Sequence, residues 1–419
     1  MVALVKPSPN RTPEAKPLDQ PLSNLRVLHL VGDSQPDAAG AAAINFARAT
    51  RKAGGQAFWA APKGLLFTAL PQEGIRAVEL SAPPLSYFGE FAMLHRLTAF
   101  VRKERVALIH LHSPELARLS SRLAAATGIP FVATLSGSFA ALPPHQQAAL
   151  LSAQHLFVSA TDQEAAIRQQ KPDLPTSLIA EAVDLERFTA GAVKPLLFAR
   201  FCEELNLNEA MSVALFCMSQ MQSKALSLYL DTLPELDRPD LVTLFLLPSG
   251  SDRGEVQALE QRLFKAGLHD RALVMLPRAD ARLYYQLADF VVSDREHSAF
   301  DRQIAEAQAV GKPVLVALRD GKEAQVLPGH RGWVFMPDSP LSLLTAQRRI
   351  LSLSERERQQ YAQACQTWLA QHHALSDAWD GIETVYQQTI DAISSVSVEV
   401  SEDTQPNRLP NTPRPVATG

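Results

Sequence analysis

The chain has 419 residues, of which 46% are hydrophobic and 20% are charged, a composition typical of globular proteins. This length predicts two or three domains and excludes a largely disordered or collagen-like chain. Because 40 Lys and Arg residues stand against 44 Asp and Glu residues, the net charge is −4, and we expect no charge-driven binding of nucleic acid. The three cysteines form neither a disulfide framework nor a zinc motif, which favours a reducing cytoplasm.

Proline is concentrated at the two ends of the chain. Five of the 29 prolines lie in residues 1–23 and four in residues 401–419, and neither end shows apolar periodicity. We therefore expect disordered tails over residues 1–23 and 396–419. The first residues contain no apolar stretch of signal-peptide length, and no run approaches the roughly 18 apolar residues of a membrane-spanning helix.

Short apolar runs alternate with helical patterns in the first half of the chain. The runs predict strands at 25–31, 56–61, 106–112, 131–137 and 155–160, and the helical spacing predicts helices at 40–53, 64–73, 87–105, 114–127 and 162–170. Glycines 54, 74 and 128 stand where three of these helices should end. This alternation predicts a parallel sheet with helices on both faces, in a domain over residues 24–190.

The same pattern starts again after a strand-free linker at 191–210. Further strands are predicted at 212–218, 241–247, 272–277, 290–294 and 313–318. They give a second domain over 211–375, and we expect a final helix over 376–395 that crosses back to the first domain. The predicted fold class is therefore α/β, with two Rossmann-like domains facing a central cleft and a helical C-terminal end. Ligands of such sheets bind outside the carboxyl ends of the strands.

Residues 291–317, VVSDREHSAFDRQIAEAQAVGKPVLVA, carry the densest motif. They resemble the donor-site segment of glycosyltransferase family 4, a family with the GT-B fold. RVLHLVG (26–32), IHLHSP (109–114), GIPFVATLSGSF (128–139) and VDLERF (183–188) follow the order of that family. The resemblance covers roughly residues 25–390. It implies a retaining transfer of a sugar from a nucleotide-sugar donor, without a metal or other cofactor, because the nucleotide-sugar is itself a substrate.

The resemblance assigns a phosphate-binding role to the segment CMSQMQSKALS (217–227). The family places an Arg and, five residues later, a Lys after the first strand of the second domain, and these cations stabilise the charge on the leaving diphosphate. Lys224 matches the Lys, whereas Ser219 stands at the Arg position. A lysine offers a point charge, but the planar, bidentate guanidinium is missing here.

The resemblance also assigns the other donor-binding residues. Glu306 matches the family's second glutamate, which holds the ribose hydroxyls, whereas Ser298 replaces the first glutamate, which contacts the transferred sugar. Backbone amides near Ala299 and Phe300 are expected to approach the phosphates. Asp301 replaces a glycine there, and its carboxylate would repel a diphosphate unless it points away or is paired.

On the acceptor side, the resemblance points to Gly40, His112, Ser136 and Gly137. Gly40 is what remains of a Gly-Gly pair after the first strand, and Ser136 takes the His position of a Thr-x-His-Gly segment. The family's Asn-Gly-Val-Asp before the linker reads EAVD at residues 181–184 here. The acceptor implied by the family is a glycan or a lipid-linked sugar, in cell-envelope or exopolysaccharide synthesis.

Two further features have alternative interpretations. His110 and His112 share one face of a strand and could form a metal pair, but no third ligand has a suitable spacing, so we expect a structural or cleft role and no metal. The segment 87–105 could be a membrane-surface helix at the inner face of the membrane. A helix that packs on the sheet with a solvated basic end is the favoured interpretation.

Two functions remain open from the sequence. The first is a hexosyltransferase-like enzyme in the cytoplasm. The second is a catalytically inactive relative that binds a sugar or regulates a partner, and the changes at Ser219, Ser298, Asp301 and Ser136 favour it. A GT-B sugar epimerase is a third, weaker possibility, because the linker and the Glu306 segment resemble the transferases.

Overall fold

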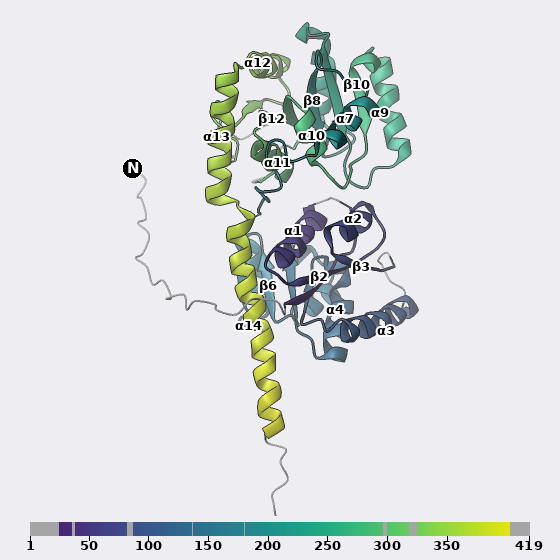
Figure 1. Ribbon diagram of the computed structural model, residues 1–419, viewed down its shortest axis with the longest axis vertical. Coiled ribbons are helices and arrows are strands. Elements are labelled where there is room, and N and C mark those ends of the chain that lie inside the picture. The colour runs from purple at the N-terminus through teal and green to yellow at the C-terminus, as the bar shows by residue number, and fades with distance from the viewer. Residues whose placement is uncertain are drawn as a thin grey trace, which may run out of the picture.

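A computed structural model describes residues 25–35, 38–81, 87–135, 137–179, 181–295, 300–317 and 325–402. Figure 1 shows two α/β domains, one above the other, with a long C-terminal helix running down beside the lower domain. Each domain contains one parallel sheet covered by helices on both faces. The predicted fold class, with its helical C-terminal end, is confirmed. The predicted tail at 1–23 lies outside the described residues.

The sheet of the first domain has seven parallel strands in the order β3-β2-β1-β4-β5-β6-β7. Their bounds are β1 Arg26–Leu30, β2 Gln56–Ala61, β3 Arg76–Glu79, β4 Leu108–Leu111, β5 Phe131–Leu135, β6 His155–Val158 and β7 Thr176–Leu178. Successive residues of a strand face opposite sides, so Leu28 packs under α3 and α4 while Val27 packs toward Phe46 and Trp379. Both faces of this sheet are therefore buried, as its nearly continuous apolar strands require.

The helices of the first domain lie where the sequence pattern predicts them, with local changes at prolines. They are α1 Ala38–Lys52, α2 Leu65–Ala69, α3 Tyr87–Lys103, α4 Ala117–Thr127, α5 Pro144–Leu150 and α6 Thr161–Gln170, with 3₁₀ turns η1 Leu70–Glu73, η2 Pro114–Leu116 and η3 Phe139–Ala141. The predicted helix over 64–73 is split because Pro71 cannot donate the next α-helical hydrogen bond. Gly128 ends α4 in the left-handed conformation, at φ +72°.

The sheet of the second domain has six parallel strands in the order β10-β9-β8-β11-β12-β13. The strands are β8 Ser212–Cys217, β9 Leu241–Leu246, β10 Ala272–Met275, β11 Phe290–Ser293, β12 Val314–Ala317 and β13 Trp333–Phe335. The helices are α7 Pro195–Glu204, α8 Lys224–Thr232, α9 Arg253–Lys265, α10 Arg282–Leu287, α11 Arg302–Val310 and α12 Pro340–Leu351, with 3₁₀ turns η4 Leu233–Leu236 and η5 His269–Arg271.

The last two helices connect the domains. Helix α13 (Glu355–His372) packs on α11, and α14 (Leu375–Glu402) packs against α1 of the first domain. In Figure 1, α13 lies beside the upper domain and α14 beside the lower one. The chain passes between domains at Val183 and Ala374, which pair as an isolated parallel bridge. Buried Trp379, Ile382 and Tyr386 then join α14 to the core of the first domain.

Three details differ from the sequence prediction. Helix α7 lies inside the predicted linker, because Pro195 begins a helix whose Phe201 is buried beside Tyr284. Helix α14 continues to Glu402, past the predicted tail boundary at 396. The edge strands β3, β7 and β13 were not predicted, because they are short and only partly buried and so do not form a long continuous apolar run like those of the central strands.

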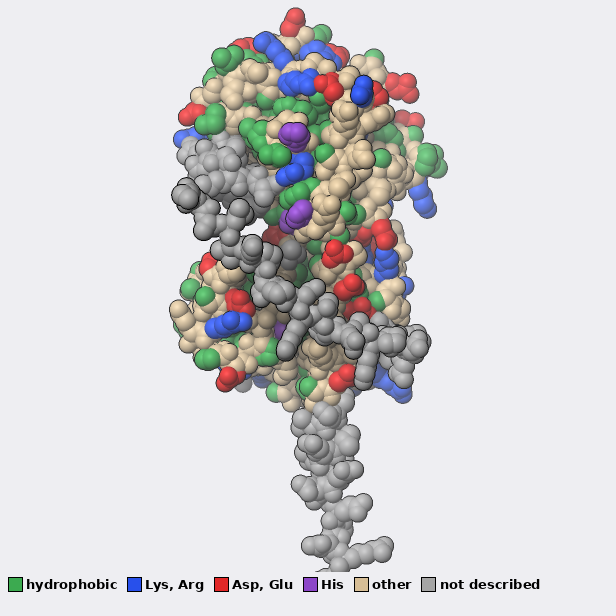
Figure 2. Space-filling view, turned by 90° about the vertical axis from the view of Figure 1, so that its left-hand side faces the viewer, with side chains coloured by type: hydrophobic (Ala, Val, Ile, Leu, Met, Phe, Trp, Pro, Cys, Tyr) green, Lys and Arg blue, Asp and Glu red, His purple; other side chains and the backbone are tan. Residues whose placement is uncertain are grey.

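Charged side chains of both signs are interspersed on the face of the molecule shown in Figure 2. Helix α3 combines buried Met93, Leu97 and Val101 with exposed Phe91 and Arg96, so it packs against the sheet as the favoured interpretation expected. Within the described residues, no helix has both the length and the apolar character needed to cross a membrane.

Candidate functional site

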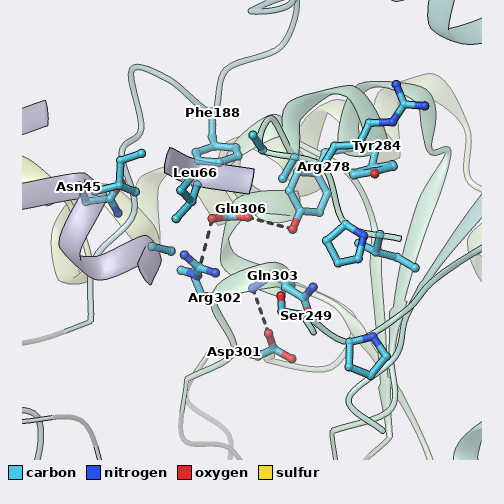
Figure 3. Close-up of a pocket in the computed structure, with 18 of the residues that line it drawn as sticks. Asn45, Leu66, Phe188, Ser249, Arg278, Tyr284, Asp301, Arg302, Gln303 and Glu306 are labelled. Atoms are coloured by element: carbon cyan, nitrogen blue, oxygen red, sulfur yellow. Dashed lines mark hydrogen bonds and ion pairs between the residues drawn. The ribbon is translucent and has the colours of Figure 1, made fainter. Parts of the chain in front are cut away.

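A cavity of about 370 Å³ lies between the two domains. The second domain contributes residues that follow the carboxyl ends of β8, β9 and β10, among them Ser219 and Ser249. The first domain contributes α1, with Ile44 and Asn45, and Leu66 of α2. Figure 3 shows Asn45 and Leu66 facing the residues of the second domain across this cavity. The cavity occupies the position at which parallel α/β sheets bind ligands.

Glu306 is buried in the wall of this cavity, in the second turn of α11. The Tyr285 hydroxyl donates a hydrogen bond of 2.9 Å to Glu306 Oε2, and Arg302 Nε lies 3.8 Å from Glu306 Oε1. Figure 3 shows the contact between Arg302 and Glu306 as a dashed line. Burial raises the pKa of Glu306, and the positive charge of Arg302 opposes that shift. The carboxylate is thus oriented by two neighbours, and it lines the cavity as the sequence resemblance expected.

Asp301 caps the N-terminus of α11. Its Oδ1 accepts hydrogen bonds from the backbone N–H groups of Gln303 (3.0 Å) and Ile304 (3.4 Å), and its Oδ2 accepts one of 2.8 Å from the Ser293 hydroxyl. Gln325 holds the Asp301 backbone through a pair of hydrogen bonds. The carboxylate is therefore paired, which removes part of the expected repulsion. It also occupies amides that a phosphate could otherwise bind.

A buried carboxylate directly after β11 holds the loop that follows β8. Asp294 Oδ1 accepts a hydrogen bond of 2.7 Å from the backbone N–H of Ser219, and burial raises the Asp294 pKa. Ser219 lines the cavity, as expected. Lys224 begins α8 directly after the N-cap Ser223; its side chain is exposed and is not among the described residues that line the cavity.

Arginine supplies the positive charge of the cavity. Five arginines line it, and they come from both domains: Arg48, Arg187, Arg278, Arg295 and Arg302. The sequence analysis missed all five as site residues. Arg302 could have been found, because it precedes Glu306 by four residues on one helix and so shares its face. The other four come from separate segments of the chain that only the tertiary fold brings together.

Arg187 lies between acidic groups of the two domains. Its guanidinium is 3.6 Å from Glu73 of the first domain and 3.6 Å from Asp280 of the second. Glu73 also accepts a bidentate pair of hydrogen bonds from Arg48, at 2.6 and 2.7 Å. Burial lowers the pKa of Arg187, while the two carboxylates oppose that shift. This arrangement ties the segment that contains Arg187 to both domains.

A second cavity, of about 230 Å³, adjoins the first on the side of the first domain. Asn45, Glu181 and Arg302 line both cavities, and Gly137 lines the second one. Gly40 is buried in α1, directly before Ala41 of the main cavity. Phe300 and Asp301 line the main cavity, whereas Ser136, Ser298 and Ala299 lie outside the described residues.

His112 does not line either cavity among the described residues; it belongs to a buried cluster with His29 and His110. His29 Nδ1 and His112 Nε2 are hydrogen bonded at 3.0 Å, and His110 bonds Thr134 at 2.7 Å and Tyr386. No third ligand has a suitable spacing in the sequence, but the fold brings one to the pair, because β1 pairs with β4 and places His29 beside His110.

The histidine cluster already has partners for most of its nitrogens. Both ring nitrogens of His110 are hydrogen bonded, so a metal ion could bind it only if one of these bonds were lost. Among the described residues, His29 Nε2 and His112 Nδ1 have no hydrogen-bond partner. Burial lowers the pKa of all three histidines, that of His29 to about 3. The three uncharged imidazoles are therefore part of the core, where His110 and His112 stack on Phe46.

The two parallel sheets and the arginine-lined cavity between them place the chain in the GT-B class of proteins. Residues 37–173 match the model of the glycosyl transferase 4-like domain, and residues 212–352 match the model of glycosyl transferases group 1. Together the two matches cover both domains in the order of the family. The chain belongs to the glycosyltransferase family 4-like proteins with the GT-B fold.

Curated relatives match about half of the chain. A D-inositol 3-phosphate glycosyltransferase of Xylanimonas cellulosilytica is 30% identical over 201 residues, which are 46% of this chain and 48% of the relative. One of Catenulispora acidiphila is 28% identical over 212 residues, 48% of each chain. The chain thus matches about half the length of these relatives.

Solved structures share the fold at low identity. A glycosyltransferase of Rickettsia africae has a TM-score of 0.68 at 16% identity, over 88% of this chain and 99% of that one. Anabaena HepE, in complex with UDP and glucose, has a TM-score of 0.65 at 18% identity, over 87% of this chain and 99% of that one. These similarities extend over both domains and establish the shared architecture.

Proposed function

We propose that the protein is a retaining glycosyltransferase that moves a sugar from a nucleotide-sugar to an acceptor in the cleft. The observation that carries this proposal is the interdomain cavity, which is lined by five arginines and by the oriented Glu306. A nucleoside diphosphate is a dianion or trianion with two ribose hydroxyls. Guanidinium groups suit the phosphates, and a fixed carboxylate suits the hydroxyls.

The chemistry required of the site is stabilisation of the leaving diphosphate. Negative charge grows on that group as the glycosidic bond breaks, and preorganised cations around it lower the barrier. We assign this role to the arginines that line the cavity. Glu306 then binds the ribose. No metal or cofactor is included in this proposal, since the guanidinium groups of arginine can bind a phosphate in place of a metal cation.

The acceptor is proposed to enter from the first domain, near Gly137 and the second cavity. Retention is expected to follow from attack on the face that the diphosphate leaves, with a phosphate oxygen accepting the acceptor's proton. The proposed acceptor class is a glycan or a lipid-linked sugar, in envelope or exopolysaccharide synthesis in the cytoplasm. The D-inositol 3-phosphate glycosyltransferases and HepE bear on this proposal as relatives that act on or bind sugar substrates.

A nucleotide screen tests the proposal. The melting temperature of the full chain is measured with millimolar UDP, GDP and ADP, and with their glucose or mannose conjugates. At least one nucleotide should raise the melting temperature, because a ligand that binds only the native state stabilises it. Glu306→Gln should reduce that shift, whereas Glu260→Gln, at an exposed position of α9, should not. A chain that shows no shift with any nucleotide would contradict the proposal.

A second function, that of an inactive sugar- or partner-binding relative, is favoured by one observation. Asp301 bonds the first amides of α11 and brings a carboxylate to the donor side of the cavity. Slow release of sugar from the nucleotide-sugar distinguishes the two functions. An active enzyme should hydrolyse the donor that stabilises it, and should lose this activity in Glu306→Gln. Nucleotide binding without hydrolysis or transfer would favour the inactive relative.

A further inference from the structure

Three carboxylates line the main cavity, and two of them are engaged by neighbouring groups. Asp301 caps α11, and Glu306 is held by Tyr285 and Arg302. The third is Glu181. Within the described residues, no hydrogen bond or ion pair involves its side chain. Glu181 is therefore the carboxylate of this cavity whose oxygens are open to a ligand.

The backbone of Glu181 is fixed although its side chain is open. Its carbonyl oxygen accepts a hydrogen bond of 2.7 Å from His373 Nδ1, and Val183, two residues later, pairs with Ala374. His373 packs in turn on the Phe300 ring, at a centroid distance of 4.4 Å. Glu181 thus lies beside the crossing point between the domains, where a hydrogen bond from His373 holds its backbone.

Glu181 lies at the junction of the two cavities. Along with Asn45 and Arg302, it lines both the donor-side cavity and the second cavity. Partial removal from solvent raises the pKa of Glu181, the charges of Arg302 and Arg295 oppose that shift, and Asp301 adds to it, although the residue remains exposed overall. A ligand that spans the junction must pass this carboxylate, and a hydroxyl there can donate a hydrogen bond to it.

The lining of the second cavity suits a small ring with polar edges. Phe46, Leu135, Val158 and Ile179 supply apolar walls, whereas Asn45, Thr134 and Ser159 supply polar groups. Its volume of about 230 Å³ is below the roughly 300–1,000 Å³ of pockets for drug-sized ligands, so it suits a single ring. Cyclic polyols combine an apolar ring face with a rim of hydroxyl donors. Two neighbouring hydroxyls can bond the two oxygens of one carboxylate.

We propose that Glu181 is the acceptor-recognition residue, and that it binds the hydroxyls of a neutral cyclic polyol, a monosaccharide ring or a cyclitol, seated in the second cavity. This inference rests on the proposed function, because it places the polyol beside the donor site. Thr134 also lines this cavity and offers its hydroxyl to the same ring, and His110 orients that hydroxyl through the bond of 2.7 Å.

The test measures binding of three probes to the full chain saturated with its stabilising nucleotide. The probes are myo-inositol, glucose and cyclohexanol, which has the ring but a single hydroxyl, and binding is followed by saturation-transfer NMR. Glu181→Ala should weaken binding of myo-inositol or glucose at least tenfold, and Glu181→Gln, which keeps one acceptor oxygen, should weaken it less. Cyclohexanol binding should change less than twofold.

The control variant is Glu186→Gln, five residues after Glu181, whose carboxylate pairs with Lys52 outside both cavities. It should bind the polyols as the unmodified chain does, and all three variants should keep the nucleotide affinity within twofold. Absence of polyol binding to the unmodified chain, or equal binding by Glu181→Ala, would overturn the inference. Either result leaves the proposed function standing if the nucleotide still binds, whereas loss of nucleotide binding in the unmodified chain would contradict the proposed function itself.

Discussion

The Tyr285 hydroxyl donates a hydrogen bond of 2.9 Å to Glu306, and both side chains are buried. The bond joins α10 to α11 and fixes the carboxylate on the wall of the interdomain cavity. A carboxylate held in this way loses little rotamer freedom when it binds hydroxyls. We therefore expect Tyr285 to act as a positioning residue for the donor site.

Tyr285→Phe should lower the affinity for the stabilising nucleotide about three- to tenfold, because Glu306 would lose one of its two orienting contacts. The free energy of unfolding should fall by about 1 kcal/mol, the net value of one hydrogen bond. Titration calorimetry and urea unfolding measure the two effects. Tyr284→Phe is the matched control, because the Tyr284 hydroxyl bonds the Leu276 carbonyl and not Glu306. Equal loss of affinity in both variants would contradict the positioning role.

Asp301→Asn should strengthen nucleotide binding about three- to tenfold. The substitution keeps an N-cap acceptor on α11 but removes a negative charge from the donor side of the cavity. Stability should change little, whereas Asp301→Ala should cost about 1 kcal/mol because the cap is lost. Calorimetric titration of both variants measures the affinity. Weaker binding by Asp301→Asn would show that the carboxylate assists the ligand instead of repelling it.

Arg187→Gln should affect the arrangement of the domains more than their stability. Its partners keep other cations, since Glu73 remains bonded to Arg48 and Asp280 to Arg282. No buried carboxylate is left alone, so we expect a loss of less than about 1 kcal/mol. The link across the cavity is broken, however, and small-angle scattering should show a larger radius of gyration. An unchanged radius would contradict the linking role of Arg187.

Acid should destabilise the first domain through its buried histidines. Burial lowers the pKa of His29 from 6.5 to about 3, so between these values the unfolded histidine binds a proton that the native one does not. The free energy of unfolding should therefore fall as the pH decreases below 6.5, by up to about 1.4 kcal/mol per pH unit for this histidine. Urea unfolding at pH 7.5, 6 and 5 measures the slope.

His29→Gln should make this pH dependence less steep, because it removes one titrating group from the cluster. The comparison with the unmodified chain cancels the contribution of the carboxylates. His95→Gln, at an exposed position of α3, serves as the matched control. An equal slope in His29→Gln and in the unmodified chain would show that another group governs the loss of stability in acid.

The sequence was sufficient for the features that depend on local pattern. Continuous apolar runs predicted the central strands of both sheets, and the motif around Glu306 located the wall of the cavity. Asp301 was recognised as an unusual residue, but its hydrogen bonds to α11 and Ser293 depend on the geometry of the loop. Pattern alone shows that a carboxylate is present and leaves open what it contacts.

Contacts between distant segments could not be predicted from local sequence pattern. Arg48, Arg187 and Arg278 are far apart in the chain and converge only because two domains enclose one cavity. His29 joins His110 because β1 and β4 are neighbours in the sheet, and no spacing rule reports that pairing. The missed residues share this cause: their role is set by strand order and domain packing.

The most direct test of the account is a calorimetric titration of the full chain with the nucleoside diphosphate that raises its melting temperature most. The account predicts one binding site per chain, with an affinity that falls at least tenfold in Glu306→Gln, about 1.4 kcal/mol of binding free energy. If Glu306→Gln binds the nucleotide as tightly as the unmodified chain does, the arginine-lined cavity beside Glu306 is not the donor site.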